Sequence, residues 1–159
     1  MRKTKRIFTC LLIWALIFTG EAFAFPHSAA GKSTVKEMAV HFMDVGQGLS
    51  ILVQSGGKNL VYDGGDKETS SYVVSYLKKQ KVESIDYLIS SHYDSDHLAG
   101  LIGCLNAFDV KNVIGSDYEH NSKLYRSFMD AVSAQELTVQ HPKVGTEFSF
   151  GTGDFTILS

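Results

Sequence analysis

Four side chains that can bind metal ions fall within six consecutive residues of this sequence. His92, Asp94, Asp96 and His97 supply two imidazoles and two carboxylates just after a short apolar segment. Charged groups this close repel one another and lose hydration unless a cation balances them. Two imidazole–carboxylate pairs suit two divalent cations about 3.5–4 Å apart, which can activate a water molecule for a displacement. The alternative, a polar loop in which Asp96 caps a helix starting at Leu98, accounts for neither histidine.

The residue types narrow the choice of metal. Two histidines with two aspartates favour zinc, and the second carboxylate keeps manganese and iron as alternatives. Other metal-binding side chains stand alone, since His120 falls in a polar loop and His141 beside Pro142. We expect both histidines to be exposed to solvent. We expect Cys104, on the apolar face of a predicted helix, to lie in the core.

The segments that must position this cluster predict a mixed α/β layered fold. Three short strands at 38–43, 49–54 and 59–63 are joined by glycine-containing turns and form an antiparallel meander. Apolar residues then take helical spacing. Helices are expected at 69–79, 98–107 and 122–134, strands at 85–90, 110–114 and 137–139, and a last hairpin with arms at 144–150 and 155–159. A meander followed by alternating helices and strands is typical of layered α/β domains.

The sequence stops within the last of these predicted strands. Residues 155–159 have no closing turn, cap or polar tail after them. We therefore expect the complete protein to continue, with residues 37–159 forming only the N-terminal portion of a domain.

The N-terminus has the features of a secretory signal peptide. Residues 2–6 carry four basic side chains, residues 7–19 are uncharged and mostly apolar, and Ala22-Phe23-Ala24 fits the small-x-small pattern of a cleavage site. The apolar run is shorter than the roughly 20 residues that a membrane-spanning helix needs. We expect residues 1–24 to be removed, a linker at 25–36, and a secreted or extracytoplasmic protein. An uncleaved membrane anchor is the alternative.

Charge and cysteine content restrict the function further. The chain has a net charge of −2, and cleavage after Ala24 would remove four basic residues but only Glu21 among the acidic ones. An acidic chain lacks the broad basic face that non-specific nucleic-acid binding needs. This weakens a pure DNA-binding role without excluding an enzyme whose metal ions meet a phosphate. Cleavage would also remove Cys10, which leaves Cys104 without a partner for an internal disulfide.

Three motifs carry a resemblance to a known family. The segment His92-x-Asp94-x-Asp96-His97 resembles the His-x-His-x-Asp-His signature of the metallo-β-lactamase superfamily, with aspartate in place of the second histidine. This variant is similar to that of the soluble domain of the ComEC competence proteins. The stretches at 41–48 (HFMDVGQG) and 61–65 (VYDGG) resemble that family's opening strand and turn and its first-aspartate motif. The resemblance covers roughly residues 38–159.

The resemblance implies a fold and a set of metal ligands. The fold would be the αββα sandwich of the superfamily, of which this chain holds the N-terminal half. His92 and Asp94 would hold a first metal, and Asp96 and His97 a second. Asp96 would also be the catalytic residue that orients the bridging water.

Two outer carboxylates are implied as well. Asp63 would hold the metal-site loops by hydrogen bonds, as carboxylates behind metal ligands do; a turn residue before Gly64-Gly65 is the alternative. Asp44 would be a second such carboxylate, although a turn residue at a strand end is the better interpretation of Asp44.

Some positions depart from the family pattern. Leu49 stands where an acidic residue is common, and Tyr93 replaces a common proline. The superfamily also takes a bridging aspartate and further ligands from later strands, and nothing here clearly matches them, since Asp154 opens a predicted strand instead of ending one.

The predicted function is a secreted metal-dependent hydrolase of phosphodiesters, with DNA as a candidate substrate. A metallohydrolase of lactams, lactones or thioesters is one alternative, and a truncated, non-catalytic binding module is another. The partner expected is the phosphodiester or small-molecule substrate, and a membrane only through an uncleaved signal segment. Nothing in the sequence indicates the oligomeric state.

Overall fold

The computed structural model of the chain describes residues 37–158. The chain divides into two units, Met1–Ser33 and Thr34–Ser159, and the described residues belong to the second. The expected signal peptide at 1–24 and linker at 25–36 lie outside the described residues. Among residues 37–158, no helix is both long enough and apolar enough to cross a membrane.

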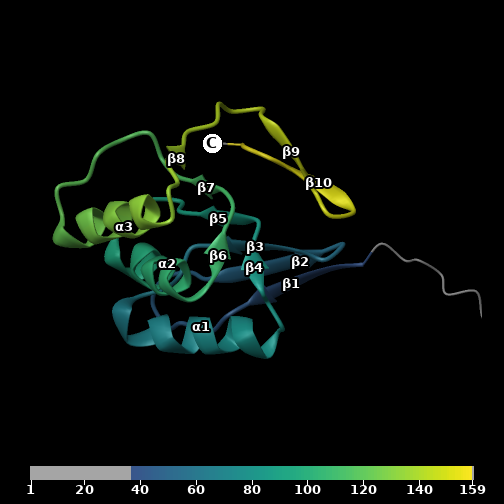
Figure 1. Cartoon of the computed structure of the whole chain (residues 1–159), viewed down its shortest axis with the longest axis horizontal. Coiled ribbons are helices and arrows are strands. Elements are labelled where there is room, and N and C mark those ends of the chain that lie inside the picture. The colour runs from purple at the N-terminus through teal and green to yellow at the C-terminus, as the bar shows by residue number, and fades with distance from the viewer. Residues whose placement is uncertain (1–36, 159) are drawn as a thin grey trace, which may run out of the picture. The chain divides into compact units, whose positions relative to one another are not determined.

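A six-stranded mixed sheet forms the centre of the described unit (Figure 1). Its first strands pair as an antiparallel meander, as predicted, and the remaining strands run parallel to the third. In sheet order the strands are β1 (Met38–Phe42), β2 (Ile51–Ser55), β3 (Lys58–Tyr62), β5 (Tyr87–Ile89), β7 (Val113–Ile114) and β8 (Val139–Gln140). Since β3, β5, β7 and β8 are parallel, their carboxyl ends lie along one edge of the sheet.

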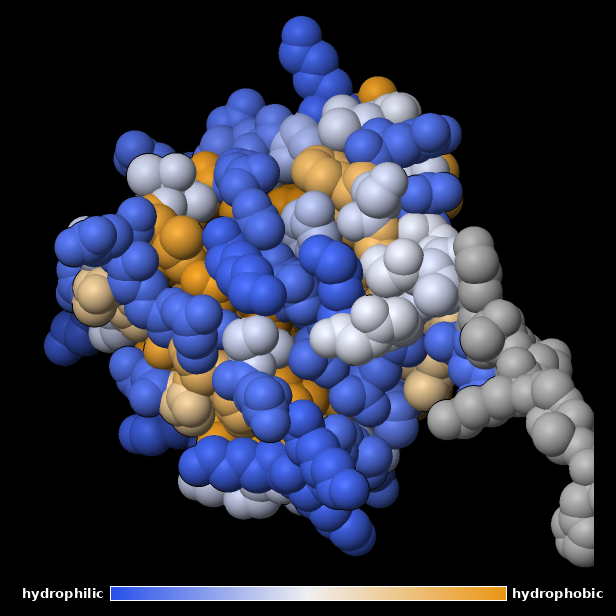
Figure 2. All heavy atoms as spheres, turned by 45° about the vertical axis from the view of Figure 1, so that its right-hand side comes forward, coloured by the Kyte–Doolittle hydropathy of each residue, from blue (hydrophilic) through white to orange (hydrophobic). Residues whose placement is uncertain are grey.

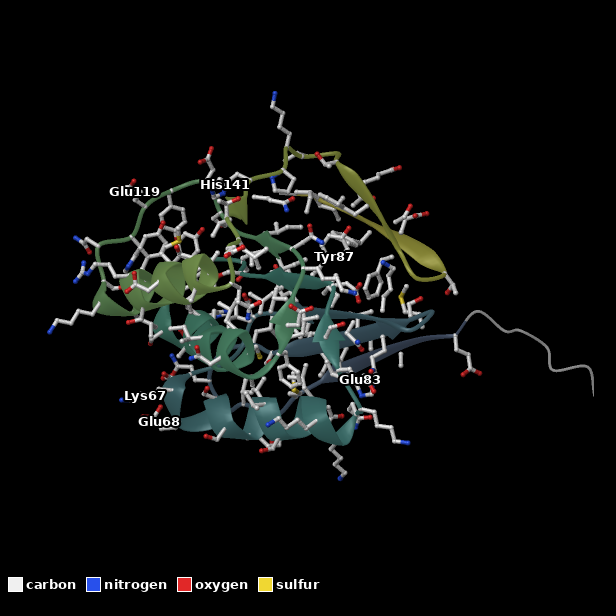
Figure 3. All side chains as sticks on the ribbon, viewed as in Figure 1. Lys67, Glu68, Glu83, Tyr87, Glu119 and His141 are labelled. Carbon is white, nitrogen blue, oxygen red and sulfur yellow. The ribbon has the colours of Figure 1, made fainter. Side chains whose placement is uncertain are left out.

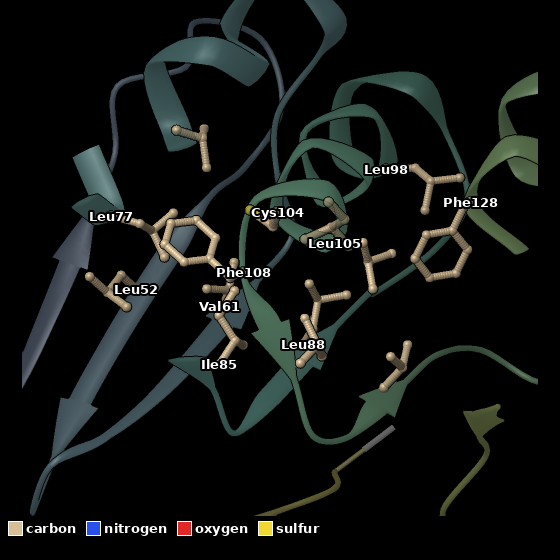
Figure 4. Packing of buried hydrophobic residues seen from close by; sticks show 14 of the residues in the cluster. Leu52, Val61, Leu77, Ile85, Leu88, Leu98, Cys104, Leu105, Phe108 and Phe128 are labelled. Carbon is tan, nitrogen blue, oxygen red and sulfur yellow. The ribbon is translucent and has the colours of Figure 1, made fainter. Parts of the chain in front are cut away.

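Helices cover one face of this sheet (Figure 1). They are α1 (Ser70–Lys79), which follows the short 3-10 turn η1 (Lys67–Thr69), α2 (Ser95–Ala107) and α3 (Lys123–Ala134). Between helices and sheet lies the main apolar core, in which Leu52, Val61 and Leu88 of the strands meet Leu77 and Leu105 of the helices (Figure 4). Successive residues of a strand point to opposite faces, so Leu52 and Val61, which pair across β2 and β3, reach the helical side together.

A hairpin packs on the opposite face of the sheet. Its strands are β9 (Glu147–Phe150) and β10 (Gly153–Thr156), joined by a two-residue turn. Tyr87 of the sheet lies below the hairpin (Figure 3), and its ring centroid is 5.0 Å from that of Phe155. The hairpin was predicted, but its second arm at 155–159 was misplaced, because Gly153 already pairs with Phe150 across the turn.

Between the hairpin and the sheet lies a cavity of about 980 Å³. Apolar side chains of both elements line most of it, while Ser90, Ser91 and Ser116 line it where the parallel strands end. On the face shown in Figure 2, hydrophilic side chains cover most of the surface and hydrophobic ones show in the hollows between them.

Two predicted strands are each divided by a polar interruption. The predicted strand 85–90 becomes β4 (Ser84–Ile85) and β5, and 110–114 becomes β6 (Asp109–Val110) and β7; β4 pairs with β6 in a separate parallel ladder. Asp86 interrupts the first of these strands, and Lys111-Asn112 interrupts the second. Asp86 is 4% exposed and accepts hydrogen bonds from the Asn59 N–H at 3.0 Å and Lys111 Nζ at 3.0 Å. Burial opposes ionisation of Asp86, but these hydrogen bonds and the charges of Lys111 and Lys58 outweigh it and hold its pKa below the usual value.

Helix α2 begins earlier than predicted. Its first residue is Ser95 and its N-cap is Asp94, whose backbone is extended (φ −75°, ψ 154°) and whose carbonyl accepts from the Leu98 N–H at 3.0 Å. Asp96 therefore lies in the first helical turn, where a carboxylate is favoured by the helix dipole, and does not cap the helix.

Candidate metal centre

The predicted ligands gather at the carboxyl ends of β3 and β5. Asp63 follows β3 directly, and the segment from Ser90 to Asp94 joins β5 to α2. His97 then returns on the first turns of the helix. The parallel pairing of Tyr62 with Ile89 places these two strand ends side by side, so residues about 30 positions apart in sequence can touch.

Asp63 makes hydrogen bonds to both parts of this loop–helix segment. Its side chain is fully buried, and its carboxylate accepts from the Ser91 N–H at 2.8 Å, from the Ser91 hydroxyl at 2.7 Å and from Nδ1 of His97 at 2.8 Å. Its backbone has φ 55°, a left-handed conformation that aspartate tolerates better than most residues. Burial and the nearby Asp63 carboxylate raise the pKa of Tyr62.

In both histidines of the cluster, Nε2 faces the carboxylate of an aspartate. Nε2 of His92 lies 3.6 Å from Oδ2 of Asp94, and Nε2 of His97 lies 3.7 Å from Oδ2 of Asp96. In each ring Nδ1 is bonded on the other side, to Ser91 Oγ at 2.8 Å for His92 and to Asp63 for His97. The ring centroids of His92 and His97 are 4.0 Å apart, so the two imidazole–carboxylate pairs are adjacent.

This donor set fits divalent metal ions. Two ligands at zinc bond lengths of about 2.0–2.2 Å around a tetrahedral ion lie roughly 3.3 Å apart, close to the separation within each pair. Metal-binding histidines also typically donate their second ring N–H to a carboxylate, a backbone carbonyl or water. Here Nδ1 of His97 contacts the Asp63 carboxylate and Nδ1 of His92 contacts the Ser91 hydroxyl, so both rings are held in a comparable way. Within residues 37–158, no three His, Cys, Asp or Glu side chains are arranged to hold one ion together. Each pair would therefore offer a bound ion two ligands, and water or other groups would have to complete its coordination.

Glycines allow neighbouring turns to approach the cluster closely. Gly48, in the turn after β1, has φ +103°, and a Cβ built on it would lie 2.9 Å from the carbonyl carbon of Asp96. Gly64 and Gly100 likewise meet backbone to backbone, while the Gly64 N–H donates to the His97 carbonyl at 2.7 Å. The stretches 41–48 and 61–65, which contain Gly48 and Gly64, thus pack against the first turns of α2. Their contacts fix the positions of Asp96 and His97.

The sequence of the chain matches the model of a known protein family. Residues 43–156 match the model of the metallo-beta-lactamase superfamily, which is most of the chain and includes the whole cluster. The chain belongs to the metallo-beta-lactamase superfamily. The predicted fold class is thereby confirmed, and the sheet with its helical layer and hairpin is the part of that fold seen here.

Relatives with curated names support the narrower resemblance to ComEC competence proteins, which is confirmed. The chain is 31% identical over 97 residues to Recombination protein 2 of Haemophilus influenzae and 33% identical over 88 residues to Competence protein ComA of Neisseria gonorrhoeae. These matches cover 58% and 55% of this chain but only 12% of each relative.

Solved structures of the superfamily fold are similar in shape. The metallo-beta-lactamase SMB-1, in a complex with mercaptoacetic acid, has a TM-score of 0.53 and 14% identity, covering 70% of this chain and 46% of its own. A flavo di-iron protein from Thermotoga maritima has a TM-score of 0.51 and 21% identity, covering 67% of this chain and 26% of its own. These likenesses show a shared fold.

The roles of two residues near the cluster were not predicted from the sequence. One is Ser91, whose N–H and hydroxyl both donate to the Asp63 carboxylate. Tyr93, which stands where the ComEC pattern has proline, is 1% exposed and anchors the metal-site loop: its hydroxyl donates to the Ser116 carbonyl at 2.7 Å and its N–H donates to the Tyr118 hydroxyl at 3.2 Å. Burial, with Tyr125 and Tyr118 nearby, raises the pKa of Tyr93 to about 12. The only signal for this anchor was an aromatic residue inside a polar segment.

The remaining candidates lie outside this hydrogen-bond network. Asp44 is exposed, and its carboxylate accepts from the Gly46 N–H at 3.3 Å, which is the turn role that the sequence favoured for it. His141 is exposed at the end of β8 (Figure 3) and donates Nδ1–H to the Gly115 carbonyl at 3.0 Å. His120 is half-buried, not exposed as expected; its ring centroid lies 6.4 Å from that of Tyr125, and its Nδ1 accepts from the Ser122 N–H at 3.2 Å. Cys104 is fully buried, as expected, and burial raises the pKa of its thiol to about 12.

Proposed function

We propose that this chain carries part of the active site of a metal-dependent hydrolase that cleaves phosphodiesters, with DNA as a candidate substrate. His92 and Asp94 would hold one divalent ion and Asp96 and His97 a second, with zinc favoured and manganese or iron as alternatives. The observation that carries the proposal is the convergence of the two pairs, with each Nε2 facing a carboxylate and each Nδ1 bonded behind it.

Individual residues of the chain would have separate roles in hydrolysis. Bound divalent ions lower the pKa of a coordinated water and balance charge on a phosphate. Asp96, on the first turn of α2, would accept a hydrogen bond from the attacking water and orient it. Asp63 would keep His97 aligned through the 2.8 Å hydrogen bond to Nδ1. Tyr93 would keep the loop that bears His92 and Asp94 against the body of the domain.

The choice of phosphodiesters rests on the relatives and on the ligand types. Both relatives with more than 30% identity carry names that refer to recombination or competence. Asp94 stands where β-lactamases of the superfamily usually have histidine. The matches span 12% of those relatives, so the activity, substrate and partners of the whole protein are proposals here.

Export from the cytoplasm is part of the same proposal. The basic start, the apolar run at 7–19 and the Ala22-Phe23-Ala24 site support removal of residues 1–24 by a signal peptidase. N-terminal sequencing of the protein recovered outside the cytoplasm should begin at Phe25. Recovery with Met1 or Arg2 at its start would instead support the membrane anchor.

Hydrolysis is tested with the complete protein loaded with zinc or manganese. Bis-p-nitrophenyl phosphate and single-stranded DNA should be cleaved, and a chelator or the substitution His92→Ala should abolish cleavage. His120→Ala is the matched control, because it removes a histidine that lies outside the cluster. A loaded protein that turns over nitrocefin but neither phosphodiester would favour the lactam alternative. If no substrate is cleaved and His92→Ala behaves as wild type, the binding-module alternative holds.

A further inference from the structure

One buried carboxylate reaches both histidines of the candidate metal centre. Asp63 contacts His97 directly, since its Oδ2 lies 2.8 Å from Nδ1 of that ring. It reaches His92 through Ser91, whose hydroxyl lies 2.7 Å from Asp63 Oδ2 and 2.8 Å from Nδ1 of His92. Ser91 is therefore the residue that connects the second ring to the carboxylate.

The number of available hydrogens determines the direction of each bond. A carboxylate can only accept, and a serine hydroxyl has one hydrogen to donate. The short contact between Ser91 Oγ and Asp63 uses that hydrogen. Ser91 Oγ then has only lone pairs to offer His92, so Nδ1 of His92 must carry the hydrogen and donate it. The same rule makes Nδ1 of His97 the donor to Asp63.

We propose that Ser91 is a positioning residue that fixes the tautomer of His92, so that both histidines carry hydrogen on Nδ1 and present a free lone pair at Nε2. The Nε2 atoms are the ones that face Asp94 and Asp96, at 3.6 and 3.7 Å. A single carboxylate thus prepares both rings, one directly and one through a hydroxyl. The use of these lone pairs for metal binding rests on the proposed function; the tautomers themselves do not.

Ser91 is itself held firmly, as a positioning residue must be. Its N–H donates to the other oxygen of Asp63 at 2.8 Å, and its carbonyl accepts from the Ser116 hydroxyl at 2.6 Å. The backbone of Ser91 therefore remains in place when only its hydroxyl is removed. Side-chain substitutions at position 91 therefore report on the hydroxyl of Ser91 alone.

The direct test is the tautomer of each ring in metal-free protein. Long-range ¹H–¹⁵N NMR spectra, recorded with chelator at a pH where free imidazoles are neutral, distinguish hydrogen on Nδ1 from hydrogen on Nε2. We expect both His92 and His97 to carry it on Nδ1 in the wild type. In Ser91→Ala we expect His92 to lose this preference while His97 keeps it. Hydrogen on Nε2 of His92 in the wild type would overturn the proposal.

A matched pair of variants isolates the hydroxyl. Threonine and valine side chains have nearly the same shape, so Ser91→Thr should retain the wild-type tautomer of His92 and Ser91→Val should lose it. Zinc affinity should fall about 10- to 100-fold in Ser91→Val and stay near wild type in Ser91→Thr. Equal tautomers in the two variants would contradict the role of the hydroxyl. Should Ser91→Ala or Ser91→Val fail to fold, the wild-type and Ser91→Thr spectra still decide the question.

Ser50→Ala is the control for general loss of a buried hydroxyl near Asp63. The Ser50 hydroxyl donates to the backbone carbonyl of Asp63 at 3.0 Å and not to its carboxylate. We expect this variant to lose stability but to keep both tautomers. The NMR readout needs neither metal nor substrate, so a failed hydrolysis assay would count against the proposed function alone. Tautomers of His92 that differ from those expected would count against the proposed role of Ser91 alone.

Discussion

The turn after β1 should control the metal site through one glycine. We predict that Gly48→Ala destabilises the protein far more than Gly46→Ala, two positions earlier in the same turn. Both glycines have positive φ, +103° and +69°, so an alanine is strained at either position. They differ in their surroundings: a Cβ at Gly46 would meet nothing within 4 Å, whereas one at Gly48 would press on Asp96.

The magnitude follows from these two contributions. A left-handed backbone costs a residue other than glycine about 1–2 kcal/mol, which is the whole expected effect of Gly46→Ala. At Gly48 the Cβ would lie 2.9 Å from the carbonyl carbon and 3.1 Å from Cβ of Asp96, so the turn or the helix start must move. Overpacking of this kind adds about 1–3 kcal/mol. We therefore expect a total loss of roughly 2–5 kcal/mol for Gly48→Ala.

Urea denaturation followed by circular dichroism, with chelator present, measures this difference. For a slope near 2 kcal/mol per molar urea, the midpoint of Gly48→Ala should fall by about 1–2.5 M, and that of Gly46→Ala by about 0.5–1 M. Zinc affinity should also fall in Gly48→Ala, because Asp96 is displaced, and remain unchanged in Gly46→Ala. Equal losses of stability in the two variants, with zinc affinity intact in both, would refute the coupling between this turn and Asp96.

Other predictions concern buried polar groups. Asp86→Asn should lower the free energy of unfolding at pH 7 by about 2 kcal/mol, whereas Asp130→Asn, at an exposed position, should change it little. Because the folded-state pKa of Asp86 is depressed, the stabilisation by its carboxylate is present above the ordinary aspartate pKa of about 3.9 and is lost at lower pH. In urea melts recorded at several pH values, the difference between Asp86→Asn and wild type should therefore shrink below about pH 4. Tyr93→Phe should cost about 1–2 kcal/mol in thermal melts, since the Ser116 carbonyl loses its donor, and an unchanged melting temperature would contradict this. Cys104 should resist alkylation in the native protein and react in urea, as peptide mass spectrometry would show; rapid native labelling would mean that the core around it opens.

The local spacing of apolar residues was enough to predict the strands and the helix that bury one face against the core. The alternation of apolar residues in 49–54 and 59–63 was enough to predict β2 and β3, and the paired apolar positions of 69–79 predicted α1. Longer-range interactions decided the rest. The strand expected at 85–90 is divided at Asp86 because Asn59 and Lys111, 27 and 25 residues away, supply its hydrogen bonds.

The start of α2 shows the same limit. Asp94 and Asp96 are equally competent N-caps in sequence, so the residue types alone cannot choose between them. The hydrogen bond from the Gly64 N–H to the His97 carbonyl helps to fix the helix against the loop after β3. This bond joins segments more than 30 residues apart, and no local pattern contains it.

For the candidate site, spacing identified the cluster but not its geometry. The pattern of His92, Asp94, Asp96 and His97 was enough to predict two imidazole–carboxylate pairs. Which nitrogen of each ring faces its carboxylate depends on Asp63 and Ser91, and the role of Ser91 has no signature in sequence. The anchoring by Tyr93 depends on Ser116, 23 residues later, and the aromatic residue in a polar segment gave no indication of this partner.

Equilibrium dialysis against zinc tests the central claim most directly, comparing the complete wild-type protein with its double variant His92→Ala/His97→Ala. We predict that the wild type retains two ions per chain and that the double variant retains neither, while circular dichroism shows both to be folded. Identical zinc content in the two folded proteins would mean that these side chains gather at the sheet edge for some reason other than metal binding.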